Sequence, residues 1–278
     1  MDTLRELWAS RELLANLTSR EIRGKYRRTI FGQLWSLANP LALMLIYTFV
    51  FSFIFRITPE PGDPSGLDYF ALWLLCGLLP WMFMANVINT GMASLTDNAN
   101  LIQKVSFPRM VLPLAQVGTS AYNWFFEMGV LVIALLIAGA AVIPWLPLVI
   151  VAMVLLALFA SGIALMLSIA NVHFRDTQYF VTLVLQMWMY LTPIIYPFSI
   201  VQAESDKIGG LGDTSITIAD LYQLNPMVHF VELFRQLLYD NRWPDTSVWV
   251  WCVTAAVVTF VVGVVVFKRS EKSLAEEL

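Results

Sequence analysis

Apolar residues along the chain form long runs that are separated by short polar segments. The first run, from Ile30 to Phe55, contains 26 residues and no charge. At about 1.5 Å per residue, such a helix crosses a hydrocarbon core of about 30 Å. Five further runs are of comparable length. The pattern therefore predicts six transmembrane helices, at about residues 31–55, 70–93, 110–139, 146–170, 178–198 and 247–267.

The residues before the first run predict a different kind of helix. Residues 3–17 place leucines and a tryptophan at helical spacing, with most charges elsewhere. Thr3 with Glu6, and Thr18 with Glu21, have the spacing of capping boxes, so a second helix start is expected at Thr18. We predict an amphipathic helix lying on the membrane surface, then a basic elbow. An ordinary surface helix is the alternative.

The distribution of Lys and Arg predicts which way the chain crosses the membrane. Cytoplasmic loops carry an excess of these residues. With six spans and an internal N-terminus, 13 of the 17 cations fall on the inner side, and seven of them precede residue 30. We therefore expect both termini in the cytoplasm and the protein in the cytoplasmic membrane of a bacterium.

Composition agrees with this and excludes several chemistries. Hydrophobic residues make up 58% of the chain and charged residues 13%, against about 25% charged residues in soluble domains. The fold class is therefore an all-α membrane protein. Cys76 and Cys252 lie in apolar segments and form no metal-binding or disulfide pattern. Gly24-Lys25 lacks the remainder of a phosphate-binding loop, so we expect no cofactor or catalysis on this chain.

Two polar segments are candidates for function. Residues 94–109 lie on the cytoplasmic side, and a short helix over about 98–106 would present Leu101, Ile102 and Val105 beside Lys104. Such a helix suits docking of a soluble partner, and a plain connecting loop is the alternative. Residues 199–246 lie outside. Glu204 to Asp220 is predicted to be a polar loop.

A helix is predicted after that loop, with Asn225 as its N-cap and Pro226 in its first turn. Phe230 and Phe234 share its apolar face, and Arg235 lies elsewhere on it. Being too short to span, this helix would be interfacial or re-entrant, either as a lid over an exit or merely resting on the bilayer.

Polar and aromatic residues within the spans indicate a possible conduit. Aromatic rings stack on sugar C–H faces, and amide or hydroxyl groups exchange hydrogen bonds with sugar hydroxyls. The alternative is an interfacial aromatic belt or lipid contact. Glu127 is the one ionisable residue within a predicted span, and it either packs between helices or lines the conduit. The other candidates are Trp35, Asn39, Tyr47, Phe51, Gln186, Tyr190 and Tyr196.

Four stretches together resemble a known family. KYRRTIFGQLWSLANPLALMLIYTFVFSFIF, LIQKVSFPRMVLP, VHFRD at residues 172–176 and the external NPM…FR are similar to the membrane subunits of ABC-2-type polysaccharide exporters. That group includes transporters of O-antigen, teichoic acid and related cell-wall glycans. The resemblance covers nearly the whole chain, in order.

The resemblance implies an arrangement that periodicity alone does not. Residues 1–278 would form one ABC-2-type transmembrane domain: an interfacial helix and elbow (1–29), spans one to five (30–198), an external gate region (199–246), span six (247–267) and a cytoplasmic tail (268–278). Two copies would associate with two ATPase subunits that carry ATP and Mg²⁺. The cargo would be a polysaccharide linked to polyprenyl diphosphate. This polysaccharide would be O-antigen, teichoic acid or a galactan-type polymer. No nucleic acid is expected.

The resemblance also implies roles for individual residues. The coupling helix on the ATPase and the nearby turn would use Asn98, Leu101, Ile102, Lys104, Val105, Arg175 and Asp176. External gate helices would include Asn225, Pro226, Phe230, Phe234 and Arg235. The basic elbow would either meet the lipid diphosphate or only anchor the chain at the inner surface, through Arg23, Lys25, Arg27 and Arg28.

Other classes remain as alternatives. An ABC-2 permease could instead carry a drug or a small lipid. A membrane glycosyl- or acyltransferase would require a catalytic group near a membrane face, and Asp97, Asp176 and Asp220 are scattered candidates. A secondary transporter would be expected to show repeated halves, and residues 1–140 and 141–278 show no repeat.

Overall fold

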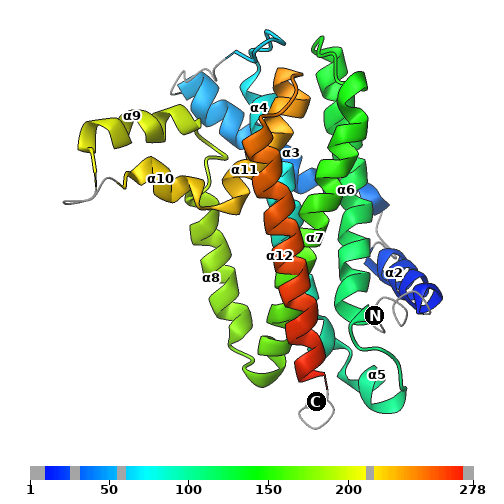
Figure 1. Ribbon diagram of the computed structural model, residues 1–278. Helices are drawn as coiled ribbons and strands as arrows, with labels where there is room; N and C mark the ends of the chain where they lie inside the picture. Colours follow the sequence, from blue (N-terminus) through cyan, green and yellow to red (C-terminus); the bar gives the residue numbers. More distant parts are fainter. Residues whose placement is uncertain (1–9, 26–31, 55–60, 211–215, 272–278) are drawn as a thin grey trace.

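The computed structural model describes residues 10–25, 32–54, 61–210 and 216–271, and within these ranges the chain is helical with no strand. Figure 1 shows the arrangement. The helices are α2 (Arg11–Lys25), η1 (Gly32–Leu34), α3 (Trp35–Tyr47), η2 (Thr48–Ile54), α4 (Phe70–Asp97), α5 (Ala99–Lys104), α6 (Val111–Ile137), η3 (Ile143–Trp145), α7 (Leu146–His173), α8 (Thr177–Tyr190), α9 (Phe198–Ile208), α10 (Ile218–Gln223), α11 (Pro226–Arg235), η4 (Gln236–Asp240) and α12 (Thr246–Ser270).

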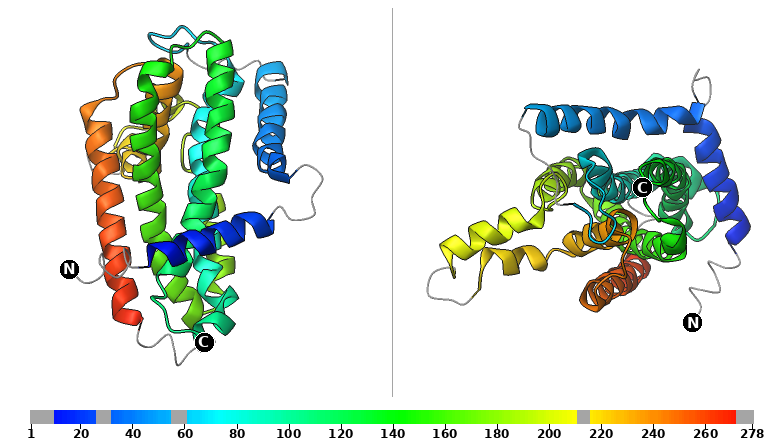
Figure 2. Two further views of the ribbon diagram at one scale, coloured as in Figure 1. Left: turned by 90° about the vertical axis from the view of Figure 1, so that its right-hand side faces the viewer. Right: turned by 90° about the horizontal axis from the view of Figure 1, so that it is seen from above.

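Four helices in the described ranges are long and apolar enough to cross a membrane: α4, α6, the continuous η3–α7 unit, and α12. They lie side by side as a bundle (Figures 1 and 2). Helix α4 is central, because α6, α7 and α11 all pack against it. We call the end of the bundle with α5 and the α7–α8 turn the basal end, and the opposite end the apical end.

Two of the six predicted spans differ from the prediction in their helical form. The first consists of η1, α3 and the π-helical η2, and it runs obliquely along the outside of the bundle (Figure 2). In the fifth, α8 ends at Tyr190 rather than continuing to residue 198. Pro193 and Pro197 explain this end, because proline lacks an N–H and disfavours helical backbone in the residue before it. The total of six spans therefore stays a prediction.

Small residues allow α7 to approach its neighbours closely. A Cβ added at Gly162 of α7 would collide with the Thr259 carbonyl of α12 and would lie 2.6 Å from the Phe260 nitrogen. A Cβ added at Gly91 of α4 would lie 2.8 Å from Cβ of Ala164. Small residues at such crossings let backbones pack directly, which drives association where lipid removes the hydrophobic difference.

Helix α2 lies across the long helices rather than along them (Figure 2). The α2 residue Leu17 is buried in a cluster with residues of α4, α6 and α12. The predicted helix start at Thr18 is wrong, since α2 continues through Thr18 to Lys25. The Thr18 hydroxyl reaches the Ala115 carbonyl of α6 at 3.5 Å instead of capping a new helix. The first expected capping box, Thr3 with Glu6, lies outside the described residues.

The apical segment between α8 and α12 is more helical than predicted. The stretch from Glu204 to Asp220, expected to be a polar loop, contains the second half of α9 and the start of α10. Together α9 and α10 project sideways from the bundle (Figures 1 and 2). The Ser205 hydroxyl accepts a hydrogen bond from the Ala219 nitrogen at 3.1 Å, which joins the two helices.

Candidate functional site

The basal end exposes a surface made by α5 and the α7–α8 turn, which we call the basal face and define by Lys104, Val105, Phe174, Arg175 and Asp176. All five residues are exposed, and Val105 and Phe174 are 51% and 69% exposed. Figure 1 shows both segments at the same end as the last turn of α12. Apolar side chains flanked by charges at the surface are typical of a docking site for a soluble protein.

Helix α5 is shorter than predicted, covering Ala99–Lys104 rather than 98–106. The expectation that Leu101, Ile102 and Val105 form one outward apolar face is wrong. Ile102 is buried in a core cluster with Leu95, Met110 and Phe267, and Leu101 packs partly against the same cluster. Val105 is exposed because the chain leaves the helix there with extended backbone.

Asn98 connects the basal face to α2. Its amide nitrogen donates to the Ser94 carbonyl at 2.9 Å, and its side-chain oxygen accepts from Arg20 of α2 at 3.1 Å. Arg109 is tied in the same region to the end of α12, since its guanidinium donates to the Glu271 carbonyl at 2.6 Å. These bonds join the start of α5 to α2, and the segment before α6 to the end of α12.

The basic elbow is only partly described. Arg23 is exposed on α2. Lys25 ends that helix, and its side chain lies outside the described residues, as do Arg27 and Arg28. The contact of the basic elbow with a lipid diphosphate stays a prediction.

Three of the predicted conduit residues, Trp35, Gln186 and Tyr190, lie on outward surfaces. Trp35 of α3 is 55% exposed and Tyr190 of α8 is 58% exposed, and Gln186 is exposed on the same helix. Only Val181 and Leu185 of α8 are buried. The side chains of Asn39, Tyr47 and Phe51 lie outside the described residues. The single chain thus leaves one side of α8 open, with aromatic and amide groups on it.

Tyr196 and Glu127 have more specific surroundings. The Tyr196 hydroxyl donates to the Tyr190 carbonyl at 2.6 Å and lies 3.3 Å from the Tyr222 hydroxyl of α10. Tyr196 therefore connects the end of α8 to α10, one of the two helices that project sideways. Glu127 is half-buried on α6, four residues after the buried Asn123, and the choice between packing and conduit stays open.

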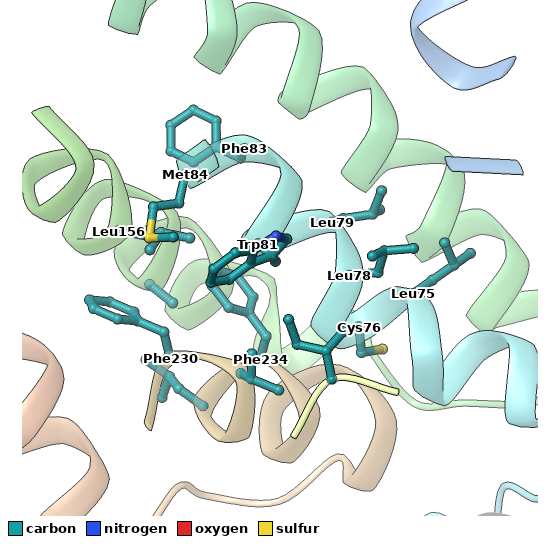
Figure 3. Close-up of a cluster of buried hydrophobic side chains, with 14 of the residues drawn as sticks. Leu75, Cys76, Leu78, Leu79, Trp81, Phe83, Met84, Leu156, Phe230 and Phe234 are labelled. Atoms are coloured by element: carbon teal, nitrogen blue, oxygen red, sulfur yellow. The ribbon is translucent and has the colours of Figure 1, made fainter. Parts of the chain in front are cut away.

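Helix α11 begins as predicted, and seven of its ten residues are buried. The Asn225 side chain accepts from the Met227 nitrogen, and Pro226 occupies the first turn. Phe230 and Phe234 are fully buried, and Figure 3 shows them within the aromatic and aliphatic cluster of α4 and α7. The face that holds Phe230 and Phe234 packs inside the bundle, and the choice between an interfacial and a re-entrant helix stays a prediction. Helices α4, α7 and α12 all contact α11, whereas its charged residues Glu232 and Arg235 are only half-buried.

Both ends of α11 hold the non-helical segment after α8, residues 191–197, which we call the α8 break. At the C-terminal end, the Arg235 guanidinium donates to the carbonyls of Pro193 and Ile194 at 2.8 and 2.7 Å. The same guanidinium carbon lies 3.6 Å from the ring centroid of Trp73 in α4, a cation–π geometry. Charge-assisted bonds of this kind are among the stronger ones in proteins.

At the N-terminal end of α11, Asn225 makes a second set of bonds, to the last turn of α8 and to the α8 break. Its side-chain oxygen accepts from Nε1 of Trp188 at 2.8 Å. Its amide nitrogen donates to the Thr192 hydroxyl at 2.9 Å. Sequence reasoning missed Trp73 and Thr192, and it did not predict the partner of Trp188. A tryptophan needing a partner for its indole N–H was the available signal, but nothing in the sequence says that Asn225 supplies it.

Replacing Asn225 with Ala should destabilise the protein by about 2 kcal/mol. The change removes a helix cap, worth about 1 kcal/mol, and leaves the half-buried Trp188 indole N–H without its acceptor. The melting temperature in detergent measures this, with Asn225→Asp as comparison because aspartate keeps both acceptor roles. Equal loss in the two variants would contradict the assignment.

Comparison with known proteins places these features in a family. A family model described as ABC-2 type transporter matches residues 12–205. The O-antigen export system permease protein RfbA of Myxococcus xanthus is 29% identical, over 99% of this chain and 98% of that protein. Its counterpart from Klebsiella pneumoniae is 28% identical, over 96% and 95%. The polysialic acid transport protein KpsM of Escherichia coli is 22% identical, over 92% of both chains. Because the family model covers well over half of its length, the chain belongs to the ABC-2 type transporter family.

Proposed function

We propose that this chain is the transmembrane subunit of an ATP-driven exporter of a polysaccharide linked to polyprenyl diphosphate. The observation that carries the proposal is the basal face, where exposed Val105 and Phe174 are flanked by Lys104, Arg175 and Asp176. A separate ATPase subunit, which carries ATP and Mg²⁺, would dock there. Relatives over nearly the full length are named for O-antigen export and polysialic acid transport, which supports a polysaccharide cargo; the proposed cargo is O-antigen, teichoic acid or a galactan-type glycan.

In the proposed assembly, two copies of the chain associate with two ATPase subunits. Each copy contributes six spans, with both termini in the cytoplasm of a bacterium, so the basal end faces inward. The open side of α8, with Gln186 and Tyr190, would meet the partner copy and line a conduit together with α3. Stacking surfaces and hydrogen-bonding groups along such a wall let a glycan slide without tight binding.

The α8 break and α11 would form the outer gate of this conduit. Asn225 and Arg235 bind the α8 break at both ends of α11, so a movement of α11 would be passed to the top of α8. The basic elbow would receive the lipid diphosphate at the inner surface, since Arg23 is exposed there and cations attract anionic head groups.

Purification of the tagged chain from its own cells, with any bound ABC-type ATPase quantified, tests the proposal. Val105→Asp/Phe174→Asp is expected to reduce the bound ATPase at least about tenfold, because each change places a charge where apolar contact is needed. Both side chains are exposed, so the fold should be unaffected. Leu101 is not used because it packs partly in the core.

The matched control is Ile208→Asp/Ile216→Asp. It changes two exposed apolar residues, one at the end of α9 and one just before α10. It should retain the ATPase at the wild-type ratio. If the wild-type chain binds no ATPase, or if both double variants bind equally, the docking assignment fails and the exporter proposal with it.

A further inference from the structure

A cavity of about 390 Å³ with both polar and apolar lining lies at the apical end, opposite the basal face. It is bounded by the first turn of α9, the α8 break, α11 with η4, and the segment that precedes α4. A volume of this order is in the range of small-ligand sites. Its lining includes Asp63, Ser199, Gln202, Glu232, Arg235 and Asp240.

Arg235 provides unused hydrogen-bond donors to this cavity. A guanidinium has five N–H donors in a fixed plane. Two of its nitrogens donate to the carbonyls of Pro193 and Ile194, whereas the Nε atom is buried and has no partner. Each terminal nitrogen carries a second N–H, and Arg235 lines the cavity, so a ligand there can accept hydrogen bonds from the guanidinium.

Acceptors lie on the other walls of the cavity. Glu232 accepts one bond from the Gln236 amide at 3.0 Å, and Asp240 lies 3.5 Å from Nε of Arg242. Asp63 and Gln202 are exposed at the rim. Burial raises the pKa of both Glu232 and Asp240, in keeping with the enclosed position of these carboxyl groups.

This mixture of donors and acceptors selects among ligand classes. Three carboxylates against two guanidinium groups disfavour a phosphate, and Arg235 and Arg242 disfavour a metal cation. A hydroxyl group both donates and accepts. A polyhydroxylated neutral ligand can therefore pair with carboxylates, amides and the guanidinium at once.

We propose that the apical cavity is a saccharide-binding site that holds a short stretch of the glycan as it leaves the conduit. The inference rests on the proposed function and adds to it a defined contact on the exit side. This site is distinct from the aromatic surface of α3 and α8, because the cavity lining contains no residue of either helix.

Isothermal titration calorimetry on the chain co-purified with its ATPase tests the site. The probe is a set of oligosaccharides from the cells' own surface polysaccharide, released from lipid by mild acid and partly hydrolysed. The wild-type protein should show saturable binding. Ser199→Trp, which fills the cavity from its rim, should weaken binding at least about tenfold, and Gln202→Ala about threefold.

Ile208→Trp is the matched control, because Ile208 is exposed on the same helix and is not part of the lining. Its affinity should stay within about twofold of wild type. Absence of binding to the wild-type protein, or equal binding by Ser199→Trp and Ile208→Trp, overturns the proposed site.

A deletion strain separates this inference from the proposed function. If cells lacking the chain lose their surface polysaccharide while the titration fails, only the apical site is wrong. If the deletion strain keeps its surface polysaccharide, the exporter proposal itself is wrong.

Discussion

Gly162→Ala should severely destabilise the protein, by about 3 kcal/mol, although it adds one methyl group. The added Cβ collides with the Thr259 carbonyl and lies 2.6 Å from the Phe260 nitrogen, both on the backbone of α12. A backbone cannot rotate away as a side chain can, so α7 and α12 must separate. This places the cost at the upper end of the range of about 1–3 kcal/mol known for overpacked cores.

Gly129→Ala is the matched control for this prediction. It is the same chemical change in another long helix, α6, and an added Cβ there meets no atom within 4 Å. Alanine favours helix over glycine by about 1 kcal/mol, so Gly129→Ala should equal or exceed wild type. Melting temperature and the fraction of monodisperse protein in detergent measure both variants. Similar values for the two would contradict the close crossing.

Arg235→Met should destabilise the protein by about 3 kcal/mol and abolish export. Methionine keeps much of the apolar stem but leaves the carbonyls of Pro193 and Ile194 unpaired, and both residues are buried. Hydrogen bonds to a charged group are worth about 1.5–3 kcal/mol each. The α8 break would then lose its connection to α11 and to Trp73.

Two further variants show whether the guanidinium is responsible. Arg235→Lys should recover only part of the loss, because an ammonium lacks the planar fork that reaches two carbonyls. Lys207→Met removes an exposed cation, whose ion pair with Glu204 is at the surface, and should change stability by less than about 0.5 kcal/mol. Melting temperature and surface polysaccharide are measured together. If the Arg235→Met protein is as stable as wild type, the Arg235 guanidinium does not hold the α8 break.

Local signals account for the elements that were predicted correctly. The start of α11 follows from Asn225 and Pro226, because the cap oxygen bonds Met227 only two residues away. The end of α8 could also have been predicted, since Pro193 and Pro197 are visible in the sequence. Treating residues 178–198 as one span gave hydrophobicity more weight than these two prolines.

The same local signals fail where a distant residue competes. Thr18 with Glu21 has a capping pattern, yet α2 continues because the Thr18 side chain lies against α6, with Oγ1 3.0 Å from the position of a Cβ at Gly118. Ile102 was expected at the surface but is buried, since Phe267 of α12 and Met110 pack over it. No pattern along the chain specifies these neighbours.

The sequence by itself determined that the chain is helical and membrane-embedded, and where most of its helices lie. These properties depend on hydrophobic run lengths, prolines and caps, which act within a few residues. Only the tertiary structure decided that α11 packs against α4, α7 and α12, that Arg235 reaches the α8 break, and that an apical cavity exists. Each of these joins segments that are distant in the sequence. Their contacts depend on which helix surfaces fit together, and that fit is a property of packing in three dimensions.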